Sequence, residues 1–353
     1  MAKIQNLSQE LIDSFIDEFK DNQQTLKTCA LVCRAFLPRV RTHRFQSISL
    51  MHDEQSSSLI TLCRASPHIP AYITSLCMKW VSVASDATLQ LLGLLSNLQH
   101  LRLFHCFTLD EVQPYIPTQN LYSLTLDTVS FRDSTELKGY IALFPSLQRL
   151  SLVEIMFLGK DHGFSTDKEN LRLDALSINF GTKIIDFAVC PIKDLRRLAA
   201  RFSASHVPPL RTLLQDNHDT LQDLYLQFFS TWLDPNLSID LSLTRLQNIT
   251  FEVWQGSATA SGRSALKWSM RTLATTPSTQ IRFLLVIYSP PENDQSVWRD
   301  LLTCHSVSID IAPYRDEHLG DCLALKALLE SEVKTKAIEV NLCPEAKPFE
   351  FSE

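Results

Sequence analysis

The sequence predicts an α/β fold in which a small all-α module precedes a solenoid of stacked strand-and-helix units. A leucine pattern recurs along most of the chain, and the first 44 residues do not follow it. Glycine is scarce, with 8 in 353 residues, about 2% against an average near 7%. So few glycines disfavour Gly-rich phosphate-binding loops and all-β folds with many tight turns. We expect the helical module at 1–44, the solenoid at 45–340 and a carboxyl-terminal tail at 341–353.

The amino-terminal segment has two stretches with helical spacing. Ser8 is placed to cap the first, whose apolar residues share one face: Ile12, Phe15, Ile16 and Phe19. The second begins near Gln24 and has these apolar residues: Leu26, Cys29, Ala30, Val32 and Cys33. A module this small cannot hide all of its apolar side chains, so some are expected to need a partner.

The rest of the chain repeats the pattern Leu-x-x-Leu-x-Leu. Clean copies begin at Leu98, Leu121, Leu147, Leu173 and Leu221. Looser copies begin at Phe45, Ile73, Leu195, Leu246, Ile281, Cys304 and Thr335. Consecutive copies start between 22 and 35 residues apart, and most spacings fall in or near the ~20–29 residue period of strand-and-helix repeats.

Each unit has the pattern expected of a short strand followed by a helix. The Leu-x-Leu part alternates with period 2, which turns its leucines to one face. Between strands, residues 134–144 place Leu137, Tyr140, Ile141 and Phe144 on one helical face, and residues 85–95 read similarly. Such units stack with parallel strands on the concave side and helices on the convex side. The apolar run at 281–288 predicts a strand covered on both faces.

Residues 45–340 resemble leucine-rich-repeat proteins of the longer, irregular kind. That family has an Asn or Cys two residues beyond the strand, and here Cys106 matches it. Other residues fill the same slot in other units: Val129, Ile155, Gly181, Phe229 and Trp254. The side-chain ladder of the family is therefore expected to be mostly absent. Residues 256–262 read as one flexible insertion.

Residues 7–12, with Leu26 and residues 30–36, resemble an F-box. The family's usual form is Leu-Pro-x-Glu-Leu followed by Leu-Val-Cys-Arg-x-Trp, and here Ser8 replaces the proline and Phe36 the tryptophan. The resemblance implies docking to a Skp-family adaptor protein and, through it, to a cullin. The adaptor-binding residues implied are Leu7, Ser8, Leu11, Ile12, Leu26, Val32 and Phe36.

The net charge and the cysteine content limit which partners and which cellular compartment we expect. Lys and Arg number 33 against 39 Asp and Glu, a net charge of 33 − 39 = −6, which disfavours nucleic acid as a partner. The cluster Arg34, Arg39, Arg41, His43 and Arg44 is better read as a solvated helix face than as a nucleic-acid or nuclear-import patch. Nine cysteines without a Cys-x-x-Cys pair indicate free thiols. With no signal peptide or membrane-spanning stretch visible, we expect a cytoplasmic or nuclear protein without a membrane partner.

The sequence offers no catalytic motif. It lacks Gly-x-Ser-x-Gly, Gly-x-x-x-x-Gly-Lys and His-Glu-x-x-His. His100, His105 and Cys106 do not make a convincing metal set, because a second paired spacing is missing. We therefore expect no catalytic residue, no metal and no cofactor.

The polar positions that flank the strand leucines are expected to face the concave side. There Arg197, Arg201 and Tyr225 are of the types enriched at interfaces, and Arg102 joins them as a target-binding candidate. The hypothesis is that they contact an acidic or phosphorylated stretch of a protein target, although ordinary solvated surface is an equal alternative.

The combined resemblance implies a substrate-recognition subunit of an SCF-type ubiquitin ligase. Such a receptor acts by holding a target near the conjugating enzyme, so it needs no catalytic side chain. One alternative is a leucine-rich-repeat interaction scaffold whose F-box is degenerate and acts outside a ubiquitin ligase. A small-molecule sensor is a third possibility.

Overall fold

The structure is a computed structural model of the whole chain, and part of the chain is described here. The described residues are 7–80, 86–105, 120–159, 171–179, 192–203, 206–228, 239, 241, 245–255, 268–269, 272, 280–287, 307–313, 318–332 and 339–343. Cys106, Gly181, Phe229 and the insertion at 256–262 lie outside them. The chain forms two compact units, residues 1–147 with 157–162 and residues 148–156 with 163–353.

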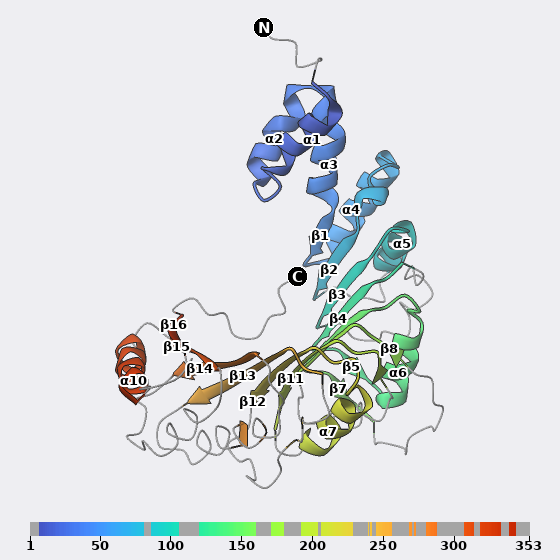
Figure 1. The fold of residues 1–353 in the computed structure, drawn as a ribbon. Coiled ribbons are helices and arrows are strands. Elements are labelled where there is room, and N and C mark those ends of the chain that lie inside the picture. The colour runs from blue at the N-terminus through green and yellow to red at the C-terminus, as the bar shows by residue number, and fades with distance from the viewer. Residues whose placement is uncertain are drawn as a thin grey trace. The chain divides into compact units, whose positions relative to one another are not determined.

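The first unit opens with three helices that pack on one another (Figure 1). They are α1 (Gln9–Asp17), α2 (Gln23–Val32) and α3 (Leu37–Phe45), with a short 3-10 turn at Arg34–Phe36 before α3. Ser8 caps α1 by accepting from the Leu11 amide, as the sequence predicts, and Asn22 caps α2 by accepting from the Thr25 amide. Pro38 lies in the first turn of α3, where its missing N–H costs nothing.

Four parallel strands follow in the same unit, each paired with the next along the chain. They are β1 (Ser47–Leu50), β2 (Ser75–Lys79), β3 (His100–Phe104) and β4 (Ser123–Asp127), with a short β5 at Ser130–Phe131. The connecting helices are α4 (Asp53–Ala65), α5 (Asp86–Leu94) and α6 (Ser134–Ala142), with a 3-10 turn at Pro70–Tyr72. Helix α4 packs against α5, and α3 contacts β1. The helical module and the first repeats are thus one compact unit.

The second unit continues the same alternation with eight main parallel strands, again paired in chain order. They are β6 (Arg149–Val153), β9 (Ala175–Asn179), β11 (Arg197–Phe202), β12 (Asp223–Phe228), β13 (Asn248–Gln255), β14 (Gln280–Ile287), β15 (Val307–Pro313) and β16 (Glu339–Leu342). The shorter strands are β8 (Leu171–Arg172) and β10 (Ile192–Lys193), which pair with each other, and β7 (Met156–Phe157), whose Met156 belongs to this unit and whose Phe157 belongs to the first. Its helices are α7 (Val207–Asp216) and α10 (Leu319–Glu332), and α10 packs on β15 and β16.

The predicted alternation holds along the strands. In the first unit Leu76, Leu101 and Leu124 stand in one register row and are fully buried. In the second unit Leu198 pairs with Leu224, and both are buried as well. The residues between these leucines lie on the opposite, polar face of the strands. The α/β fold with parallel strands in chain order is therefore confirmed.

Two details differ from the expectation. The copy assigned to begin at Ile281 is out of register by three residues, because Ile281 pairs with Ile249 and Phe283 with Phe251, so Ile281 fills the second apolar position of its copy and not the first. Among the strand residues whose burial is described, 283–286 are covered on both faces, whereas Ile281 is half-buried and Arg282 is exposed. A continuous apolar run does not reveal register, since every position in it fits an inward slot.

Backbone hydrogen bonds recur from one strand-and-helix repeat to the next. The carbonyl just before β1, that of Gln46, accepts from the amides of both Thr74 and Ser75. Equivalent shared carbonyls recur along the chain at Thr74, Gln99, Gln148, Asp174, Arg196 and Gln222. Asparagines in the preceding loops add to these bonds, since Asn97 donates to the Ala71 carbonyl and Asn120 to the Ser96 carbonyl. These bonds satisfy polar backbone groups where the chain enters each strand.

Candidate functional site

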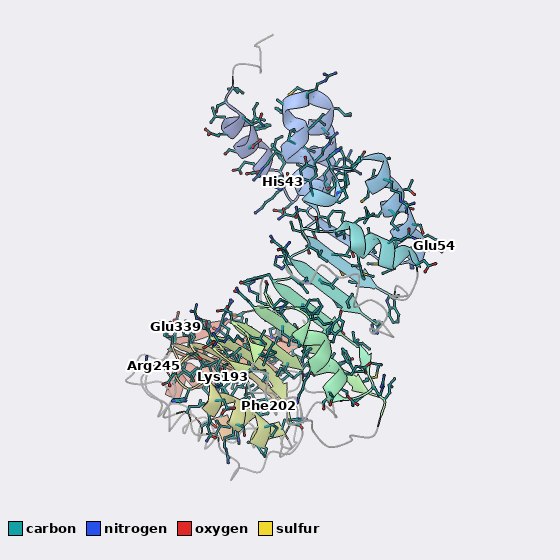
Figure 2. The ribbon with its side chains drawn as sticks, turned by 90° about the vertical axis from the view of Figure 1, so that its right-hand side faces the viewer. His43, Glu54, Lys193, Phe202, Arg245 and Glu339 are labelled. Atoms are coloured by element: carbon teal, nitrogen blue, oxygen red, sulfur yellow. The ribbon has the colours of Figure 1, made fainter. Side chains whose placement is uncertain are left out.

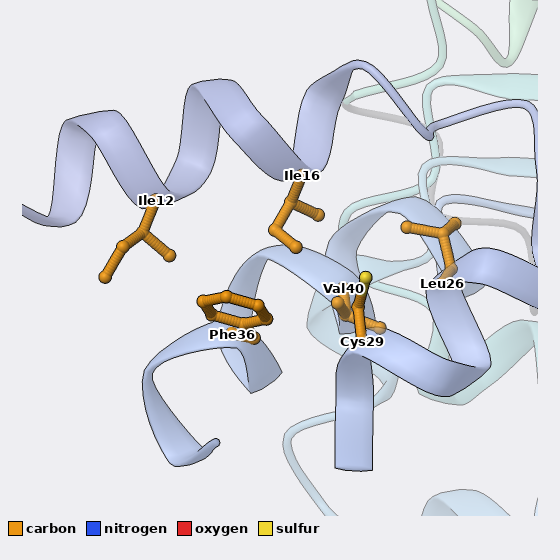
Figure 3. Close-up of a cluster of buried hydrophobic side chains, with 6 residues drawn as sticks. All are labelled: Ile12, Ile16, Leu26, Cys29, Phe36 and Val40. Atoms are coloured by element: carbon orange, nitrogen blue, oxygen red, sulfur yellow. The ribbon is translucent and has the colours of Figure 1, made fainter. Parts of the chain in front are cut away.

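The helical module has a core of its own, made of six buried side chains (Figure 3). They are Ile12, Ile16, Leu26, Cys29, Phe36 and Val40. Three of the residues implied as adaptor-binding, Ile12, Leu26 and Phe36, therefore lie inside the module rather than on its surface. Their contribution to any partner contact is to hold the helices in place.

Apolar side chains also remain exposed on the same module. Three are expected ones, Leu7, Leu11 and Val32, and two, Phe15 and Leu31, lie beside them in the sequence. We call these five the helical apolar surface; each is between 51% and 89% exposed. Leu11 and Phe15 are one turn apart on α1, so they share a face of that helix. The sequence grouped Phe15 with the other apolar residues of its helix on one face and did not single out Leu31 for binding. Which of these side chains turn inward depends on how the helices pack.

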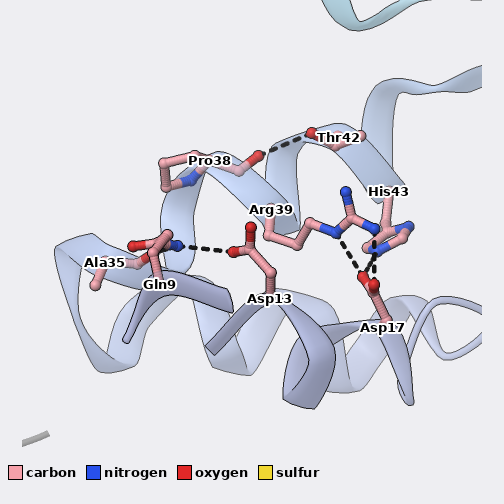
Figure 4. A network of polar contacts seen from close by, with 8 residues as sticks. All are labelled: Gln9, Asp13, Asp17, Ala35, Pro38, Arg39, Thr42 and His43. Atoms are coloured by element: carbon pink, nitrogen blue, oxygen red, sulfur yellow. Dashed lines mark hydrogen bonds and ion pairs between the residues drawn. The ribbon is translucent and has the colours of Figure 1, made fainter. Parts of the chain in front are cut away.

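An ion network joins α1 to α3 (Figure 4). Arg39 donates two hydrogen bonds to Asp17, from Nε to Oδ1 at 2.5 Å and from Nη2 to Oδ2 at 2.7 Å. The ring of His43 lies 2.6 Å from the same Oδ1. Hydrogen bonds from Arg39 and His43 hold the pKa of Asp17 at about 2, below its ordinary 3.8. Two members of the basic cluster thus serve an intramolecular contact.

Gln9 adds a second link within the module. Its side-chain amide donates to Asp13 on the same helix at 2.7 Å and to the carbonyl of Ala35 at 3.3 Å (Figure 4). The second bond ties the start of α1 to the turn between α2 and α3. Together with the Asp17 network it fixes both ends of α1 against the rest of the module.

The target-binding candidates lie on the polar face of the strands, as expected from period 2. Arg102 is half-buried on β3 in the first unit. In the second unit Arg197 donates from Nη2 to Oδ2 of Asp174 at 2.5 Å. An anion from a partner would have to compete with that carboxylate, so Arg197 gives limited support to anion binding.

Arg201 and Tyr225 belong to a second cluster, centred on Glu252. This carboxylate is fully buried and accepts from the Tyr225 hydroxyl and, at 2.6 Å, from the Gln227 amide. Burial lowers the pKa of Arg201, while the carboxylates of Glu252 and Glu154 act in the opposite direction. The sequence did not identify Glu252; the available signal was one acid among the apolar residues of β13.

No group of three or more His, Cys, Asp or Glu side chains that could hold a metal occurs within the described ranges. Burial raises the pKa of the Cys63 thiol and brings that of Cys322 to about 11, which disfavours a thiolate at either position. Cys29 and Cys33, one turn apart, are free thiols, and both belong to or pack on the module core.

Comparisons with known proteins give no assignment. Neither the models of known protein families nor the sequences of curated proteins match this chain. Among the helices of the described part, none is long and apolar enough to cross a membrane.

Proposed function

We propose that this chain is a substrate-recognition subunit of an SCF-type ubiquitin ligase. Its amino-terminal helices act as an F-box that docks to a Skp-family adaptor, and its leucine-rich-repeat strands hold a protein target. Two kinds of support exist: the resemblance of residues 7–36 to the F-box pattern and the helical apolar surface. The second carries the proposal, because it is an observation on the folded chain.

The helical apolar surface has the character of a binding site. Soluble proteins bury most large apolar side chains, and five left exposed on one small helical module favour a place where another molecule packs. The core beneath it, with Ile16 and Leu26 fully buried, supplies a preformed support. Partner binding on such a surface loses little free energy to reordering of the helices.

The test is adaptor binding by variants of the full chain. Leu11→Asp combined with Leu31→Asp changes two exposed side chains and leaves the core intact. If they anchor the adaptor, the dissociation constant should rise by about 30-fold or more, because anchor residues contribute 2 kcal/mol or more. Titration calorimetry with the purified Skp-family adaptor measures it.

A matched control is Leu158→Asp, since Leu158 is 76% exposed and lies outside the helical module. It should leave adaptor binding unchanged. If the wild-type chain does not bind the adaptor, the F-box assignment is wrong, and the scaffold that acts outside a ubiquitin ligase becomes the better interpretation. If the double variant binds as the wild type does, docking occurs elsewhere on the chain.

A further inference from the structure

An aromatic pair lies where two neighbouring strands of the first unit end, with one ring exposed and the other half-buried. Trp80 directly follows β2 and His105 directly follows β3. Their rings stack face to face, with centroids 3.8 Å apart and planes 11° from parallel. Trp80 is nevertheless 66% exposed, the most exposed aromatic among the described residues with large apolar side chains.

The backbone explains why these rings point outward. By strand alternation Trp80 would follow Leu76 and Met78 into the core, and His105 would follow Leu101 and Leu103. Both residues instead adopt positive φ, 54° for Trp80 and 52° for His105, which breaks the alternation. Thr128 and Glu154 have positive φ at the same place after β4 and β6, so the left-handed turn belongs to the repeat.

What is particular to β2 and β3 is the residue chosen for this turn. A left-handed position favours glycine, asparagine, aspartate or histidine, so His105 is ordinary there, whereas a residue as bulky as Trp80 is disfavoured. Burial of the ring does not compensate Trp80, because two thirds of it faces solvent. A large exposed ring in a strained position is typical of a residue retained for binding rather than for folding.

Basic side chains stand next to the pair on the polar face. Lys79 precedes Trp80, and its ammonium lies 5.0 Å from the centre of the Phe104 ring. Arg102 lies two residues before Phe104 on β3. The nearest acid in the same register row, Asp127, accepts a hydrogen bond from Thr128 at 2.9 Å.

Most other positions on this polar face are small. In the register rows of β1 to β4 they are Ser47, Ser49, Ser75, Cys77, Ser123 and Thr125. These side chains are short, so they leave room for an extended chain beside the two cations. His100 and Phe104 carry the rings in the same register rows.

We propose that the Trp80–His105 stack, with Lys79 and Arg102, is a docking surface for an acidic segment of a partner protein. An apolar side chain of the segment packs on the free face of the Trp80 indole, and its carboxylates face Lys79 and Arg102. A peptide is favoured over a nucleic acid because strands β1 to β4 carry just two Lys or Arg side chains, Lys79 and Arg102, whereas a nucleic-acid site needs a clustered basic patch. The proposal does not rest on adaptor docking, since it uses none of the helical apolar surface.

The test is fluorescence anisotropy with a labelled synthetic peptide, Glu-Asp-Glu-Asp-Phe-Glu-Asp-Glu, added to the full chain. Binding should be saturable, and it should weaken as salt rises, because the cations and carboxylates attract through solvent. Trp80→Ala and, separately, Lys79→Glu should each raise the dissociation constant by about tenfold or more. Trp80→Phe should retain most of the affinity, since it keeps an aromatic face.

Matched controls separate this surface from general effects. Leu158→Ala removes another exposed apolar side chain of the same unit, and Lys193→Glu reverses an exposed cation of the second unit (labelled in Figure 2). Neither should change peptide binding. Lys79→Glu leaves the aromatic stack in place, so it carries the test even if Trp80→Ala does not fold, which circular dichroism reports.

Three results would overturn the proposal. The first is no saturable binding of the acidic peptide, and the second is binding that neither Trp80→Ala nor Lys79→Glu weakens. The third is preferential binding of a labelled oligouridylate to the same residues, which would assign the stack to single-stranded nucleic acid instead. A peptide in which lysine replaces every acidic residue must bind more weakly than the acidic one.

Discussion

Arg39 on α3 and Asp17 on α1 form a two-pronged ion pair that connects the first and last helices of the amino-terminal module. The guanidinium and the carboxylate meet at 2.5 and 2.7 Å, a geometry that lysine cannot reproduce. His43 approaches the same carboxylate from one turn further along α3. The helices are therefore joined by charge as well as by their apolar core.

This pair predicts a pH-dependent contribution to the stability of the module. The pKa of Asp17 is about 2 in the folded chain against an ordinary 3.8, so folding favours its charged form. The stabilisation is fully present above the ordinary pKa and is lost as the pH falls from about 4 towards 2. Asp17→Asn removes it, and because the pair is partly exposed we expect a cost of at most about 1 kcal/mol.

Hydrogen-exchange protection of the α1 and α3 amides measures this effect in the full chain. Near neutral pH the wild type should be better protected than Asp17→Asn, and the difference should shrink as the pH falls below 3.8 and vanish only below about pH 2. Glu18→Gln is the matched control, since it removes a neighbouring exposed acid and should change protection little. A difference that persists unchanged at low pH would show that charge is not its cause.

The helical module illustrates what periodicity reveals and what it leaves open. Spacing correctly placed Ile12, Ile16 and Leu26 on helices and Ser8 at a cap. It could not tell which apolar residues form the core and which lie on the surface, because the module has more apolar side chains than three short helices can enclose. That division depends on how α1, α2 and α3 pack, which no single helix pattern contains.

The division itself is testable by truncating a buried and an exposed leucine of α2. Leu26→Ala should destabilise the module by about 2–5 kcal/mol, through lost burial and the cavity left behind. Leu31→Ala should cost less than about 0.5 kcal/mol, because its side chain is already in solvent. Hydrogen exchange of the α1 to α3 amides reports both. Equal effects would mean that the core and the surface of α2 are wrongly assigned.

The repeats were predictable wherever leucines mark the strands, as at Leu124, Leu150 and Leu224. The register predicted from the sequence was wrong at Ile281, because an unbroken apolar sequence fits several alignments of the repeat equally well. The compact units were also not predictable, because contacts from α3 to β1 join the helices to the first strands. Such joining is a property of the packed chain rather than of the repeat period.

The middle leucines of the clean repeats give a direct test of that register. Leu124, Leu150 and Leu224 are at most 2% exposed, and each truncation to Ala should cost about 2–5 kcal/mol. Chemical unfolding followed by circular dichroism measures the cost, and Leu158→Ala provides an exposed control with little effect. Neutral results at all three positions would mean that these leucines do not form the core of the repeats.

Glu252 lay beyond sequence reasoning for a different reason. A single acid in an apolar strand reads as a solvent-facing residue, and only the neighbouring strand shows the hydrogen bonds that make its burial tolerable. Tyr225 and Gln227 come from β12, about one repeat earlier, and register alone brings them opposite β13. Polar clusters of this kind arise between repeats, so a pattern within one repeat does not encode them.

The Glu252 cluster predicts a hierarchy of destabilisation. Glu252→Ala removes the acceptor shared by Tyr225 and Gln227, leaving a Gln227 side chain that is only 3% exposed without the bond to that carboxylate. Leaving a buried polar group without a hydrogen-bond partner costs about 1–3 kcal/mol, so Glu252→Ala should lower the free energy of unfolding by at least that amount. Tyr225→Phe removes one donor and keeps the other bond, so its cost should be smaller. Asp223→Asn, at a half-buried position of the same strand, is the control; it keeps the side-chain oxygen that accepts from Asn248 on β13, so it should have little effect. Unfolding midpoints in urea rank the three variants, and the order Glu252→Ala, Tyr225→Phe, Asp223→Asn is required if the carboxylate holds β12 and β13 together. A Tyr225→Phe variant less stable than Glu252→Ala would place the stabilisation in the tyrosine ring instead.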